Sequence, residues 1–166
     1  IMPLQGLDSV KKMIAKNKRE ANAKVKAVFL DGLGKVIAGT PVGLTQSEVP
    51  TSVIATSGYH RNNWFLGVGF SPTLIGRESS RAGSGSYTSL TSMPNWVLNK
   101  KIYFTNNGPA IETLEYGGYP NPVKRGSRLK GKNNFKILSI NGFSGQADSG
   151  WVRTALIAMQ NKIRSL

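Results

Sequence analysis

The stretch LDSVKKMIAKNKREANAKVKAVFLDGLGKVIAGTP, residues 7–41, decides most of the fold. Apolar side chains recur in it at steps of three and four residues, the spacing that places them on one face of an α-helix. They are Leu7, Val10, Ile14, Ala21, Val25, Val28, Phe29, Leu33 and Val36. The pattern predicts one long amphipathic helix over 7–37, whose lysines cover the remaining surface. Its apolar stripe either packs entirely on the protein's own sheet or leaves a share to face a neighbouring subunit.

Local signals mark both ends of this helix. Asp8 or Ser9 is expected to cap the start, because short polar side chains accept hydrogen bonds from the free N–H groups of the first turn. Gly39 is expected to take the left-handed conformation at the other end. Pro41 then disfavours helix in the residue before it.

Shorter elements follow along the chain. Strands are expected over 64–70, 101–106 and 135–140, a helical turn over 109–116, and a second helix from about Gly150 to the end. In the first strand, Gly67 and Gly69 leave room on one face for close approach of another backbone. Asp148 or Ser149 is expected to cap the last helix.

The last helix carries its apolar residues on one side. These are Val152, Leu156, Met159 and Ile163. A single apolar face of this kind is typical of a helix packed on a sheet or on another helix.

Two segments look like loops. Residues 76–92 are low in complexity and rich in Ser and Gly, which predicts a flexible segment. Residues 117–134 combine Gly, Pro and basic residues, which predicts a long exposed loop. The predicted fold class is therefore α+β: a long N-terminal helix and a C-terminal helix packed on a small, mainly antiparallel sheet of about four strands. One domain is expected to span residues 1–166.

Charge and composition limit the possible functions. The chain has 22 Lys+Arg against 8 Asp+Glu, a net charge of +14, so it should attract polyanions such as nucleic acid, an acidic protein or an anionic membrane. No apolar run approaches the ~18 residues of a membrane span. Cysteine is absent and His60 is the only histidine. The carboxylates are scattered, so the sequence predicts no enzyme, no metal site and no cofactor.

Three ordered blocks of sequence resemble one known family. The first is the long basic helix running into Val36–Gly43, the second is Ile102–Ala110 followed by Leu114–Tyr119, and the third is Asn141–Arg153. Together they are similar to the minor tail or neck proteins of long-tailed bacteriophages, the tail-completion family found near the head–tail junction.

Three positions depart from the family pattern. Gly43 stands where the family has Asp, Ala110 follows Pro109 directly where the family has an intervening Tyr, and Asp148 stands where Pro is usual. The departure at Asp148 concerns only the local turn.

The resemblance implies a structural virion protein of the head–tail junction or tail end, without catalytic activity. It would assemble as a ring with copies of itself and contact other head–tail connector and tail proteins, near genomic DNA in the channel and away from membranes. It would be found in the virion, and in the bacterial cytoplasm during assembly. Two alternatives remain open, a basic nucleic-acid-binding protein and a tail-terminator ring subunit.

Two groups of residues are predicted to contact partners. Six cations lie in a stretch without acids, and we expect them to touch an acidic neighbour or DNA. They are Lys124, Arg125, Arg128, Lys130, Lys132 and Lys136. Glu112 and Glu115 share one helical face, and their predicted partner is Arg153, in a clamp within or between subunits. The alternative is two solvated carboxylates.

Overall fold

The computed structural model of the chain describes residues 6–43, 58–118, 139–140, 142–144 and 148–166. The helices are α1 (Leu7–Gly39), α2 (Tyr59–Asn62), α3 (Ser84–Leu90), α4 (Ile111–Tyr116) and α5 (Trp151–Arg164). The strands are β1 (Phe65–Val68), β2 (Ile102–Thr105), β3 (Ser139–Ile140) and β4 (Phe143–Ser144). The predicted α+β class is confirmed, with a long N-terminal helix, a C-terminal helix and a small antiparallel sheet.

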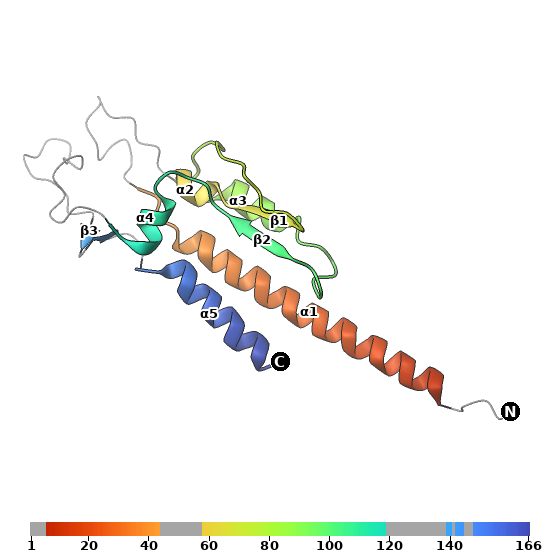
Figure 1. The fold of residues 1–166 in the computed structure, drawn as a ribbon. Helices are drawn as coiled ribbons and strands as arrows, with labels where there is room; N and C mark the ends of the chain where they lie inside the picture. Colours follow the sequence, from red (N-terminus) through yellow and green to blue (C-terminus); the bar gives the residue numbers. More distant parts are fainter. Residues whose placement is uncertain (1–5, 44–57, 119–138, 141, 145–147) are drawn as a thin grey trace, which may run out of the picture.

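Helix α1 is the axis on which the other elements pack. Helix α5 runs antiparallel to its C-terminal half, and the β1–β2 pair lies along another side of it (Figure 1). The first turns of α1 extend past both neighbours. The core therefore gathers around the C-terminal half of α1, where Val28, Val36 and Ile37 are buried.

Two glycines bring α5 close to α1. A Cβ atom at Gly32 would overlap Sδ and Cγ of Met159, and one at Gly39 would lie 2.8 Å from Cδ1 of Trp151. The Trp151 indole N–H also donates to the carbonyl of Val36, at 3.1 Å. Gly39 is thus the last residue of the helix and not a left-handed cap, which corrects the prediction. Glycine lowers helix stability, and α1 nevertheless continues through Gly32. The position needs a residue without a side chain because Met159 of α5 packs directly against it.

Strands β1 and β2 pair antiparallel, with Phe65 opposite Thr105 and Val68 opposite Ile102. They confirm the strands expected over 64–70 and 101–106. Gly67 does allow close approach, since a Cβ there would overlap the carbonyl oxygen of Phe70. Gly69 has open space around it and a φ of +81°, so it serves the turn that ends the strand.

The other strands form a separate two-residue pair, in which Ser139 lies opposite Ser144. The expected sheet of about four strands is therefore two two-stranded sheets in the described part of the chain. Of the strand expected over 135–140, only residues 139–140 lie within the described ranges.

The segment 76–92, predicted to be flexible, contains α3 and is corrected here. Ser86 is fully buried, and its hydroxyl accepts the N–H of Trp64 at 2.9 Å. Ser89 accepts the N–H of Leu66 at 2.9 Å. A composition typical of loops can form a buried helix when its hydroxyls bond an adjacent strand.

The predicted side-chain caps are wrong. Neither helix is capped by the side chain of its N-cap residue, which is a glycine with positive φ in both, Gly6 at +109° and Gly150 at +68°. The Ser9 hydroxyl instead donates to the carbonyl of Gly6 at 2.7 Å. Asp148 and Ser149 are exposed, because α5 is capped from another helix, as described below.

The close approach at Gly32 leads to a stability prediction with a matched control. Gly32→Ala should lower the free energy of unfolding by about 1–3 kcal/mol, because the added methyl displaces Met159 from a packed interface. Gly34→Ala lies in the same helix, with Cε1 of Tyr87 at 3.9 Å as its nearest neighbour, so it should raise stability by up to about 1 kcal/mol through helix propensity. Urea unfolding of both variants measures the difference. Equal effects at the two positions would contradict the packing role of Gly32.

Candidate functional site

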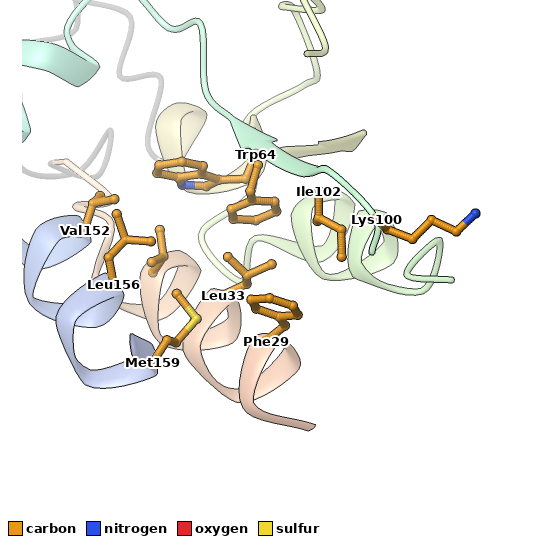
Figure 2. Close-up of a pocket in the computed structure, with 10 residues that line it drawn as sticks. Phe29, Leu33, Trp64, Lys100, Ile102, Val152, Leu156 and Met159 are labelled. Carbon is orange, nitrogen blue, oxygen red and sulfur yellow. The ribbon is translucent and has the colours of Figure 1, made fainter. Parts of the chain in front are cut away.

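An apolar groove lies where the sheet, α1 and α5 meet (Figure 2). Its volume is about 310 Å³. Its lining comprises Phe29, Leu33, Val36, Trp64, Lys100, Ile102, Phe104, Val152, Leu156 and Met159. Nine of these ten residues are apolar, and the single charge, Lys100, extends away from the others at one end of the groove.

The floor of the groove is held by a chain of contacts. The Trp64 ring stacks on Phe104 with centroids 5.1 Å apart, and its indole N–H donates to Oγ1 of Thr40 at 2.9 Å. The Thr40 hydroxyl in turn donates to the carbonyl of Val36 at 2.7 Å. These bonds tie the strand side of the groove to the end of α1.

Leu156 marks the open side of the groove. This residue belongs to the predicted apolar face of α5, and Figure 2 shows it beside Val152 and Met159. Met159 is buried, whereas Leu156 keeps 46% of its surface exposed. The predicted stripe is thus only partly covered by the protein's own residues.

The two edges of the β1–β2 sheet differ in how many of their outward backbone groups are hydrogen-bonded. The outer N–H groups of β1 donate to the Ser86 and Ser89 hydroxyls of α3. Arg77 donates to the outer carbonyl of Trp64 at 2.8 Å. The start of this edge is therefore covered, and covering an edge is one way in which sheets avoid unwanted pairing.

The β2 edge is open. Trp64 and Leu66 direct their N–H groups to α3, so the residues of β1 that bond β2 are Phe65 and Gly67. In the antiparallel register, Ile102 and Phe104 lie opposite Val68 and Leu66, so their backbone N–H and C=O groups point away from β1. Within the described ranges, no hydrogen bond reaches the N–H or C=O groups of these two residues. Their side chains line the groove, so an unpaired edge and an apolar hollow adjoin each other.

A smaller hollow of about 170 Å³ continues the groove towards α4. It shares Trp64, Val152 and Leu156 with the larger one. Glu115, Tyr116 and Arg153 also line it, so the hollow reaches the residues predicted to form a clamp.

Glu115 and Arg153 do form the predicted ion pair. Arg153 Nε lies 3.2 Å from Glu115 Oε1. The Glu115 side chain is 7% exposed, and it also accepts the backbone N–H groups of Val152 at 3.0 Å and Arg153 at 3.1 Å. The carboxylate therefore caps α5 from α4 and places its negative charge at the positive end of the helix dipole. The guanidinium also lies over the Tyr116 ring, 4.9 Å from its centroid.

The other residues predicted to contact partners do not take part in this ion pair or lie outside the described residues. Glu112 is exposed and forms no ion pair with any described residue, so the expectation that both glutamates pair with Arg153 is wrong for this one. Arg153 instead pairs with the buried carboxylate of Glu115, three residues further along α4. Lys124, Arg125, Arg128, Lys130, Lys132 and Lys136 lie outside the described residues.

A second surface is the start of α1. We call residues 7–16 the α1 arm; every residue in it is exposed. Its apolar side chains are Leu7, Val10, Met13 and Ile14, with exposed fractions of 46–57%. An uncovered apolar stripe of this kind marks an interaction site. The arm continues the stripe that packs in the core, and this part of the stripe is exposed in the described chain. That it faces a neighbouring subunit stays a prediction.

His60 is partly buried, and its ring lies edge-on to that of Tyr59, with ring centroids 5.4 Å apart. Its Nδ1 atom is buried without a hydrogen-bond partner among the described residues. Burial lowers the pKa of His60 below its usual 6.5, which favours the neutral ring. In the described ranges no group of three or more His, Asp and Glu residues could hold a metal ion, and no helix has the length and apolar character to span a membrane.

Comparison with protein-family models, with curated proteins and with solved structures found no match to this chain. The resemblance to phage tail-completion proteins therefore stays a prediction from sequence motifs.

Sequence reasoning missed the open β2 edge and the role of the α3 serines. The serines did carry a signal, since Ser86 and Ser89 stand three residues apart and share one face of a helix. The open edge carried none, because strand order within a sheet depends on contacts between distant segments.

The Glu115 cap predicts a stability effect. Glu115→Ala should lower the free energy of unfolding by about 1–3 kcal/mol, because it leaves two N–H groups of α5 and Arg153 without their acceptor. Glu115→Gln should lose less, since one amide oxygen can still accept a bond. Glu112→Gln, three residues away and exposed, is the control and should change stability by less than about 0.5 kcal/mol. Urea unfolding tests the series, and an Ala variant as stable as the control would refute the cap.

Burial of His60 predicts a pH effect. Its pKa is lowered in the folded state, so below pH 6.5 the unfolded chain binds a proton that the folded chain does not, and stability should fall as pH decreases from 7.5 to 5.5. His60→Gln removes this titration, and its stability should depend less on pH over the same interval. Urea unfolding at several pH values compares the two proteins. Identical pH dependence would show that His60 titrates alike in both states.

Proposed function

We propose that this chain is a structural virion protein of a tailed bacteriophage, a subunit of a ring that joins or completes the head–tail junction. The observation that carries the proposal is the α1 arm, whose apolar stripe has no cover within the described chain. The ordered motifs that resemble tail-completion proteins support the choice of phage and position.

The physical role of the arm follows from its exposure. An isolated helix of about ten residues is marginal in water, but here the arm is extended from a helix held in the core. It can thus present a preformed apolar stripe to a neighbour without a large ordering cost on binding. Half-burying Leu7, Val10 and Ile14 would contribute on the order of 3 kcal/mol per contact.

Ring assembly matches a surface of this kind. A ring closes through repeated contacts between two different patches, one on each side of the subunit. The α1 arm is one such patch, since its apolar side chains are exposed. Copies of the chain and other connector and tail proteins are the proposed partners, and the protein performs its role by shape alone. A tail-terminator ring would use the same surfaces.

A nucleic-acid-binding role is the second candidate, and one observation favours it. Lys11, Lys12 and Lys16 are exposed on the same arm. Contacts from such lysines to phosphates would weaken steeply as salt rises, whereas apolar contacts would not.

The arm provides a test with a matched control. Replacement of Leu7, Val10 and Ile14 by Ala keeps helix propensity but removes apolar area. In the phage that encodes this chain, we expect at least a tenfold loss of infectious particles, with filled heads and tails left unjoined in electron micrographs. Replacement of Lys11, Lys12 and Lys16 by Ala alters the same turns and should leave the yield near normal.

The two variants also separate the candidates. If the lysine variant alone lost function, and the purified protein bound DNA in a manner that weakened steeply with salt, the nucleic-acid role would replace the ring. Normal particles from both variants, or a cryo-electron microscopy map that places the chain outside the virion, would end the structural proposal.

A further inference from the structure

The groove and the β2 edge together describe a binding site for an extended peptide. Strand addition needs two features, a free row of backbone donors and acceptors and pockets for alternate side chains. Ile102 and Phe104 supply both, since their N–H and C=O groups point away from β1 while their side chains line the groove.

The asymmetry of the sheet strengthens this reading. At the start of the β1 edge, Ser86 and Ser89 accept the outward N–H groups of Trp64 and Leu66, and Arg77 donates to the carbonyl of Trp64. Within the described residues nothing performs this role for Ile102 and Phe104. Among the described residues, the β1 edge is thus covered at its start, whereas the β2 edge is left available.

The volume of the groove limits what can enter the apolar side of the site. A segment paired with β2 would direct every second side chain onto the face shared by Ile102 and Phe104. There it would meet Trp64 and the exposed part of Leu156. A volume of about 310 Å³ holds two or three aliphatic side chains but no helix.

Charge selects the partner. The end of the groove carries Lys100, and no acid is among the ten groove-lining residues. The chain as a whole carries +14, which favours an acidic partner. Lys100 would attract a segment that places a carboxylate beside it.

Antiparallel pairing gives the segment a direction. Strand β2 begins beside Lys100, and the antiparallel arrangement is the slightly more stable one. The C-terminal end of the segment then lies at Lys100.

We propose that the β2 edge and its groove bind an extended segment of another protein, apolar at alternate positions and acidic at its C-terminal end. This rests on the proposed function in one respect, that the chain is an assembly subunit, and it names the chemistry of one neighbour.

The test uses the full chain and a synthetic peptide. The peptide has seven residues, with Val at three alternate positions, Thr between them and Glu at the C-terminal end. We expect binding with amide shifts and slowed hydrogen exchange at Ile102 and Phe104 in NMR spectra. A peptide with the same sequence but N-methylated on the bonding edge should not bind. A peptide with Lys in place of the Glu should bind about fivefold more weakly.

Two variants of the protein complete the test. Leu156→Ser should weaken binding at least tenfold, whereas Ile157→Ser, next in the helix, 57% exposed and not part of the groove lining, should leave it unchanged. Lys100→Glu should reverse the preference and favour the Lys-ended peptide. Lys101→Glu serves as the charge control and should reverse nothing.

Several results would overturn the inference. They are absence of binding at millimolar peptide, equal binding of the N-methylated peptide, and loss of binding that is the same for Leu156→Ser and Ile157→Ser. Protection of Ile102 and Phe104 in a dimer of the free chain would assign the edge to a second copy and reject the acidic partner. None of these results depends on the α1 arm, so failure here and failure of the ring proposal are distinguishable.

Discussion

The close approach of α5 to α1 is the constraint on which the rest of the structure depends. It occurs where α1 has no side chain, at Gly32 against Met159 and at Gly39 against Trp151. A helix interface of this kind tolerates almost no added volume. Because Trp151 also bonds the carbonyl of Val36, the start of α5 is fixed in position as well as in distance.

The neighbouring features follow from that placement. With α5 held against α1, its first N–H groups meet the buried carboxylate of Glu115, and α4 is drawn to the end of the helix pair. Leu156 is left facing the sheet across a space that no described side chain fills. The groove is thus a result of where two helices and a two-stranded sheet meet.

In the described chain, hydrogen bonds satisfy the polar groups of the core but not those of two surfaces. Thr40, Ser86, Ser89 and Glu115 satisfy buried backbone or ring N–H groups, while the β2 edge and the α1 arm remain uncovered. Buried polar groups are normally paired, so the two uncovered surfaces stand out beside a well-satisfied core. This contrast is the physical basis of the structural role proposed for the protein.

The sequence by itself determined the long helix, the two paired strands, the turn at α4 and the C-terminal helix, because periodicity and turn residues act over a few positions. It also predicted the ion pair between Glu115 and Arg153, because an acidic and a basic residue lie beside two of the motifs that resemble the tail-completion family. It did not predict that Gly39 lies under Trp151, that the serines of α3 close one strand edge, or that α5 is capped from α4. Those outcomes were decided by tertiary structure, since each joins residues far apart in the chain, and local propensity carries no information on which distant group will supply a missing partner.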